Sequence, residues 1–71
     1  MFNSDKLRGK MAEKRCTAER LANHLGINPV TFYRKTRGES EFTRSEIQHI
    51  ATLLELTMQD IRDIFFAEEL A

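Results

Sequence analysis

The fold is decided by one stretch of the chain, AERLANHLGINPVTFYRKTRG, which runs from residue 18 to residue 38. Apolar residues recur at helical spacing on both sides of a short connection, Gly26-Ile27-Asn28. Glycine in this position readily takes the left-handed conformation that ends a helix. Asparagine caps a following helix, and proline is tolerated at the first helical position, which Pro29 occupies. The stretch therefore predicts helices over residues 18–25 and 29–37, joined by a tight turn.

The spacing inside this stretch fits two helices that cross closely. A small residue, Ala22, lies midway along the first helix, and Gly26 follows four positions later. Apolar residues surround the junction on both sides: Leu21, Leu25, Ile27 and Phe32. This pattern is typical of a helix-turn-helix unit, and the plainer alternative is a generic helical hairpin.

The start signal at Asn28 recurs along the whole chain. An apolar residue before a capping residue packs on a second apolar residue five positions later. The five pairs are Phe2 with Leu7, Cys16 with Leu21, Ile27 with Phe32, Phe42 with Ile47, and Leu56 with Ile61. Thr43 with Glu46 makes a full capping box, and Thr57 with Asp60 a weaker one. Three more helices are thus predicted, over residues 4–15, 44–54 and 58–67.

The predicted fold class is all-α, with five helices in a single domain over residues 1–71. A chain of this length buries only about 60% of the surface that its unfolded form exposes, so the core is modest. Helical spacing predicts that core: Leu7, Met11, Leu21, Ala22, Leu25, Ile27, Phe32, Ile47, Ile50, Ala51, Leu54, Ile61, Ile64 and Phe65. The lone cysteine, Cys16, is expected to be buried and inert.

The net charge is zero, but the charges are unevenly distributed. From Lys6 to Arg44 ten lysines and arginines oppose four glutamates, whereas from Ser45 onward a single arginine opposes six carboxylates. Such asymmetry indicates one basic working surface. No apolar run is long enough to span a bilayer, and the polar N-terminal stretch lacks a signal core, so we expect a cytoplasmic protein without a membrane partner.

Nothing in the sequence assembles into a catalytic or metal-binding pattern. His24 and His49 are expected to lie far apart, without a second ligand pair at metal spacing, and to be ordinary surface or half-buried histidines. No glycine-rich phosphate loop is present, and Asp60 and Asp63 are expected on an exposed helix face. We therefore expect no enzyme activity, no metal, no cofactor and no small-molecule ligand.

The chain resembles the repressor and Cro-like helix-turn-helix superfamily of bacteria and phages over nearly its whole length. The segments Lys6-Leu-Arg-Gly-Lys10, Leu25-Gly-Ile-Asn-Pro-Val-Thr-Phe32 and Ile64-Phe-Phe66 are also similar to short phage-encoded regulators from Gram-positive hosts. The superfamily usually carries an aliphatic residue at the position of Lys35, which closes the third helix onto the core. Here either the end of the helix is re-angled, or Lys35 buries its alkyl stem and snorkels.

The resemblance implies a sequence-specific regulator that binds double-stranded DNA with its third helix in the major groove. The residues that it implies for base reading are Pro29, Val30, Tyr33 and Arg34. The helix dipole and free N–H groups make Thr17 a candidate for a phosphate contact. Further candidates for contacts with the DNA backbone are Thr31, Lys35, Arg37, Lys10 and Arg44.

Besides DNA, the second partner that we expect is another copy of the chain. Phe66 lies off the apolar stripe of the last helix, and with Leu70 it suggests a homodimer contact. Two alternative functions stay open at this point. One is an antitoxin-like regulator that binds both DNA and a protein, and the other is a helical protein-interaction module that does not bind DNA.

Overall fold

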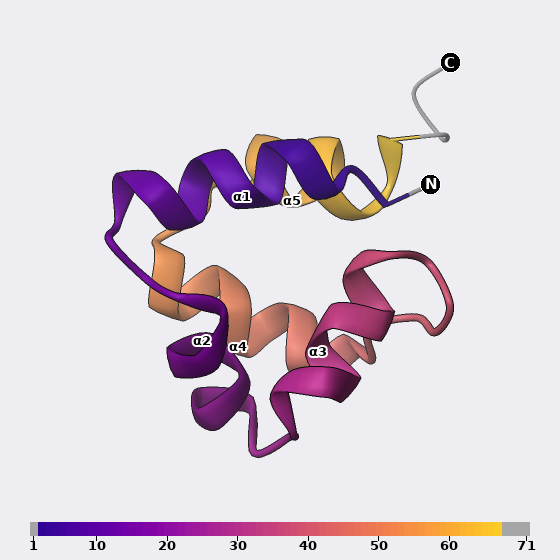
Figure 1. Cartoon of the computed structure of the whole chain (residues 1–71). Coiled ribbons are helices and arrows are strands. Elements are labelled where there is room, and N and C mark those ends of the chain that lie inside the picture. The colour runs from indigo at the N-terminus through magenta and orange to yellow at the C-terminus, as the bar shows by residue number, and fades with distance from the viewer. Residues whose placement is uncertain (1, 68–71) are drawn as a thin grey trace.

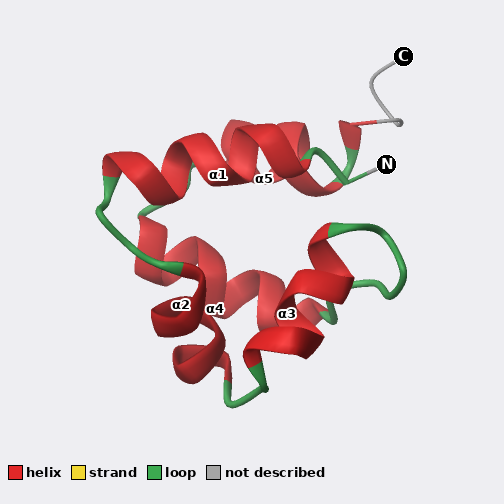
Figure 2. Ribbon diagram, in the orientation of Figure 1, coloured by secondary structure: helices red, strands yellow, loops and turns green. Residues whose placement is uncertain are grey.

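The computed structural model describes residues 2–67, and over this range it contains helices and turns but no strand (Figures 1 and 2). The helices are α1 (Ser4–Glu13), α2 (Ala18–Leu25), α3 (Pro29–Thr36), α4 (Arg44–Leu54) and α5 (Met58–Phe65). The predicted all-α, five-helix fold is confirmed.

Every helix begins where its cap was predicted. The side chains of five residues each accept a hydrogen bond from a backbone N–H in the first turn that follows: Asn3, Thr17, Asn28, Thr43 and Thr57. The capping box expected to be weak is complete, because Asp60 accepts from the backbone N–H of Thr57 while the Thr57 hydroxyl accepts from the N–H of Asp60. Each cap satisfies N–H groups that the helix itself leaves without partners.

The helix ends follow prediction less closely. Gly26 takes a left-handed φ angle of 73°, as expected, and Gly38 after α3 takes one of 84°. Arg15 and Glu55 also take positive φ angles, both 54°, without the freedom of glycine. The first helix therefore ends at Glu13, two residues before the predicted end, and α3 and α5 also end slightly early.

The helices form two packed groups that share a core. In Figure 1, α1 and α5 lie side by side and run in opposite directions, while α2, α3 and α4 pack beneath them. The N–H of Asn3 donates to the carbonyl of Ile64 at 2.6 Å, which joins the start of α1 to the end of α5. The Lys6 ammonium lies 2.8 Å from the carboxylate of Asp63, and this hydrogen bond holds the pKa of Asp63 below its usual value.

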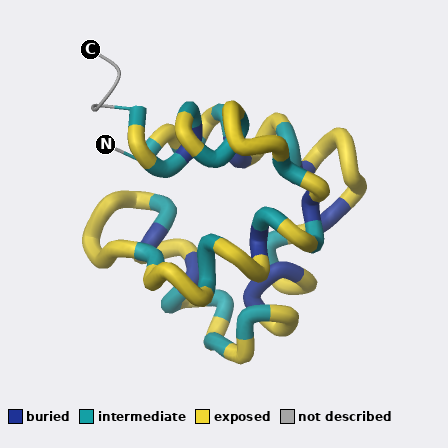
Figure 3. The backbone as a smooth tube through the Cα atoms, turned by 180° about the vertical axis from the view of Figure 1, so that it is seen from behind, coloured by how far each residue is buried: buried dark blue, intermediate teal, exposed yellow. Residues whose placement is uncertain are grey.

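The core is close to the predicted one. Its buried members are Leu7, Met11, Cys16, Leu21, Ala22, Phe32, Ile50, Leu54 and Ile64. Three predicted core residues, Leu25, Ile27 and Phe65, are partly buried against it. Three more, Ile47, Ala51 and Ile61, are only half-buried. In contrast, all four residues of the connection over residues 38–41 are exposed (Figure 3). None of the helices described is long and apolar enough to cross a bilayer.

Candidate nucleic-acid interface

The outward face of α3 is exposed to solvent. Val30 and Tyr33 are 56% and 45% exposed, and Arg34 is exposed beside them. Pro29 and Thr31 flank this face and are half-buried. No carboxylate of the described residues forms an ion pair with Arg34, so its guanidinium is available to an external acceptor.

The orientation of this face is set by the turn before it. The left-handed Gly26 lets the N–H of Ile27 donate back to the carbonyl of Ala22 at 3.0 Å, which closes the end of α2. The side chain of Asn28 then accepts from the N–H of Val30 at 2.8 Å, which starts α3. On the opposite side of α3, Phe32 is buried against the core. These contacts hold α3 against α2 at a fixed angle.

Lys35 lies on the inner face of α3 and is buried. Its ammonium group donates to Glu46 Oε1 at 2.8 Å and to the carbonyl of Glu41 at 3.2 Å. It also lies 5.8 Å from the centre of the Phe42 ring. The side chain therefore does not snorkel to solvent: a lysine–glutamate pair takes the place of an aliphatic contact. Because its charge is already paired inside the protein, Lys35 is not available as the phosphate contact that the sequence suggested.

Glu46 joins the end of α3 to the start of α4. One of its oxygens accepts from Lys35 and also from the backbone N–H of Thr43, both at 2.8 Å. Burial raises the pKa of Glu46 and is the largest single effect, but the hydrogen bonds from Lys35 and Thr43 together outweigh it. The pKa of Glu46 is therefore below its usual value, and the carboxylate is charged at neutral pH.

The other residues predicted to contact the DNA backbone differ in how accessible their polar groups are to an external phosphate. Thr17 is exposed, and its hydroxyl oxygen accepts from the N–H of Arg20 at 3.1 Å, which leaves the hydroxyl proton to donate outward. Arg44 is exposed at the start of α4. Arg37 is exposed and lies 2.9 Å from Glu39. Lys10 is half-buried, and its ammonium lies 3.6 Å from the carboxylate of Glu13 and 3.5 Å from that of Asp60 on α5, so it is less accessible than Arg44.

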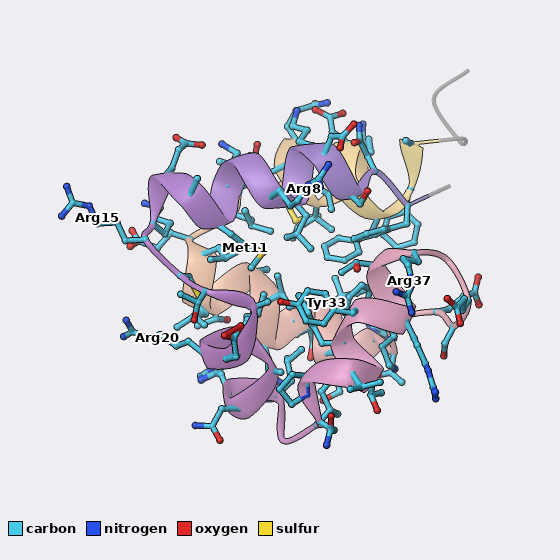
Figure 4. The ribbon with its side chains drawn as sticks, viewed as in Figure 1. Arg8, Met11, Arg15, Arg20, Tyr33 and Arg37 are labelled. Carbon is cyan, nitrogen blue, oxygen red and sulfur yellow. The ribbon has the colours of Figure 1, made fainter. Side chains whose placement is uncertain are left out.

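Three exposed arginines between Lys6 and Arg44 were not among the predicted site residues. Arg8 lies on α1, Arg15 in the connection to α2, and Arg20 on α2 (Figure 4). No carboxylate among residues 2–67 forms an ion pair with Arg15 or Arg20. The signal that could have found them is the excess of positive charge between Lys6 and Arg44.

The two histidines are closer than the sequence suggested. The ring centres of His24 on α2 and His49 on α4 lie 6.0 Å apart, so the expectation that they are far apart was wrong. Both side chains are exposed, and Nδ1 of His49 lies 2.8 Å from the carbonyl oxygen of Ser45. Within the described residues, no group of three or more potential ligands could hold a metal ion.

A tight turn between α2 and α3, with an exposed face on α3 that carries an arginine, is the arrangement of helix-turn-helix DNA-binding proteins. The family model of the Cro/C1-type HTH DNA-binding domain matches residues 6–66, and the chain belongs to this family. The resemblance to the repressor and Cro-like helix-turn-helix superfamily is thus confirmed, and the chain is a DNA-binding regulator of a family that is typically non-enzymatic. Searches among curated proteins and among solved structures gave no match.

Proposed function

We propose that this chain is a transcriptional regulator of the phage or prophage repressor or Cro type, acting as one domain over residues 1–71. It lays α3 in the major groove of a short palindromic operator and blocks or redirects transcription there. The observation that carries the proposal is the outward face of α3, where an arginine without an ion-pair partner among the described residues stands beside an exposed valine and tyrosine. This activity needs no cofactor.

In the proposed complex, the first two turns of α3 read the bases. Arg34 donates two hydrogen bonds to the O6 and N7 of a guanine, and Val30 rests against a thymine methyl group. Pro29 contributes shape only, because it has no N–H and no polar side chain. Tyr33 is long enough to donate its hydroxyl proton to a base or to a phosphate.

Other residues position the domain on the phosphates without reading sequence. Thr17 offers its hydroxyl beside the free N–H groups at the start of α2. Thr31, Arg37 and Arg44 lie near the two ends of α3 and at the start of α4, and their contacts would fix the height of α3 in the groove.

We further propose that two copies of the chain pair through α5, so that two α3 helices read the two halves of the operator. Phe66 is 39% exposed immediately after α5, which fits an apolar contact between copies. The second predicted contact residue, Leu70, lies outside the described residues. Sedimentation equilibrium of Phe66→Ser tests this: a dimer that becomes a monomer supports the contact, and an unchanged mass contradicts it.

The experiment for base reading compares the affinities of Arg34→Ala and Arg62→Ala for an operator duplex obtained by selection from random DNA. Both variants remove one exposed arginine, but Arg62 is on α5. Removing a bidentate hydrogen-bonded pair with guanine costs about 1–3 kcal/mol, which corresponds to roughly 5- to 150-fold in affinity. We expect this reduction for Arg34→Ala alone, together with a relaxed preference at one guanine. Equal effects of the two variants would refute the reading role of α3.

A further inference from the structure

A groove of about 420 Å³ lies between α1 and α3, on the side that Figure 4 presents. Its floor is apolar and is built from the buried side chains of Leu7, Met11 and Phe32. Its rim is polar and comes from both helices: Ser4 and Arg8 on α1, and Tyr33, Thr36 and the C-cap residue Arg37 of α3. The groove therefore has an apolar floor and hydrogen-bond donors along both edges.

The two arginines are placed on opposite walls of this groove. Figure 4 shows Arg8 on α1 and Arg37 at the C-terminal end of α3, with Tyr33 between the two helices. Each guanidinium contacts one carboxylate from its own neighbourhood in the chain, Asp5 for Arg8 and Glu39 for Arg37. Both pairs are largely exposed to solvent. Exposed pairs of this kind contribute little, so an incoming anion can replace them at low cost.

We infer that this groove is a second binding site for the DNA backbone, in which one phosphodiester group lies between α1 and α3. The inference rests on the proposed function. The planar guanidinium groups of Arg8 and Arg37 match the geometry of phosphate oxygens, and they approach the phosphate from both sides. The hydroxyl of Tyr33 donates to the same phosphate, which assigns this residue to the backbone and leaves base reading to Arg34 and Val30.

The apolar floor makes the site stronger than an open surface patch. It keeps water from one side of the bound phosphate, and charge-assisted hydrogen bonds are less screened where water is excluded. A DNA strand that follows this path leaves α3 and crosses onto α1. The protein surface in contact with DNA then extends beyond the helix-turn-helix unit. Part of the excess positive charge in the first half of the chain then serves to bind DNA phosphates.

The test is the salt dependence of binding to operator DNA by Arg8→Gln. Removal of one phosphate interaction reduces the slope of log affinity against log salt concentration by about 0.9. We expect Arg8→Gln to reduce the slope by about this amount and to weaken binding to operator and scrambled duplexes by the same factor. Tyr33→Phe should likewise weaken both equally and leave the preferred sequence unchanged.

The matched control is Arg62→Gln, which removes the same charge from α5, a helix that does not line the groove. It should keep the wild-type slope. A wild-type slope for Arg8→Gln, or a change of preferred base in Tyr33→Phe, would overturn the inference. Because Arg8 is exposed, its replacement should leave thermal unfolding unchanged, and this checks that the variant is folded.

Arg34→Ala separates this inference from the proposed function. If Arg34→Ala relaxes the sequence preference while Arg8→Gln keeps the wild-type slope, only the groove assignment fails. If the wild-type protein shows no salt-sensitive binding to any duplex, the proposed function fails and the groove assignment fails with it.

Discussion

Replacing Lys35 with methionine and Glu46 with glutamine, singly and together, measures how strongly α3 is tied to α4. Methionine keeps the apolar stem of the lysine, and glutamine can still complete the capping box with Thr43. The double-mutant cycle therefore isolates the ion pair from the packing and from the cap. The two charged atoms are 2.8 Å apart, and the side chains are only 10% and 13% exposed.

The magnitude follows from this geometry. At an effective dielectric constant of about 20, two unit charges at this distance attract each other by roughly 6 kcal/mol. The cost of removing both groups from water offsets most of that gain, so we expect a coupling energy of about 2 kcal/mol. Each single replacement leaves a nearly buried charge without its opposite charge, so it should cost about 2–4 kcal/mol, and the double replacement less than the sum.

The assay is urea unfolding of the four proteins of the cycle, monitored by circular dichroism. The control is the same cycle on Arg8 and Asp5, a pair whose side chains are 73% and 83% exposed. An exposed pair of this kind should show a coupling energy of no more than about 0.5 kcal/mol. If the coupling energy of Lys35 and Glu46 is no larger than that of the control pair, our account of how α3 is held is refuted.

Three further predictions concern the backbone and the response to acid. Gly26→Ala should lower the free energy of unfolding by about 1–2 kcal/mol, because φ is 73° and no atom within 4 Å blocks the added carbon, so the cost is conformational. Glu55→Gly should raise the free energy of unfolding by about 1 kcal/mol, because Glu55 takes a left-handed conformation at the end of α4. Both changes are read from urea midpoints, and the same sign for both would contradict this explanation. The pKa values of Glu46 and Asp63 are lowered in the folded state. Their contribution to the free energy of unfolding is therefore complete above the usual pKa values of 4.5 and 3.8, and it is lost as pH falls through the lower pKa values of the folded state. The thermal midpoint should therefore be flat from pH 7 to about 5 and fall below that, and Glu46→Gln should fall less steeply; an equal fall in the variant would count against the role of Glu46.

Much of the fold could be predicted because its signals are local. Each N-cap depends on a residue and its own first turn, and for this reason Asn3, Thr17, Asn28, Thr43 and Thr57 could all be identified without any knowledge of the tertiary structure. The turn at Gly26 has the same local character.

The rest depends on contacts between distant parts of the chain. The burial of Lys35 requires Glu46, eleven residues away, to reach the inner face of α3. The approach of His24 to His49 is set by how α2 packs on α4. Arg15 and Glu55 take left-handed conformations that their residue types do not predict. Because Arg15 follows α1, the predicted end of that helix was wrong.

The candidate site was predicted in part. The exposed face of α3 follows from helical spacing, which places Val30, Tyr33 and Arg34 on one side. The α1 wall of the groove could not be found in this way, because the position of Arg8 beside α3 depends on the packing of the two helices.

The most direct test of sequence-specific DNA binding is selection of bound sequences from a pool of random duplex DNA by the wild-type protein, repeated at two salt concentrations. We predict that one short motif containing a guanine is enriched, and that affinity falls steeply as salt rises. No enrichment and no salt-sensitive binding would contradict this prediction, and would favour a helical protein-interaction module with Phe66 as the first surface to examine.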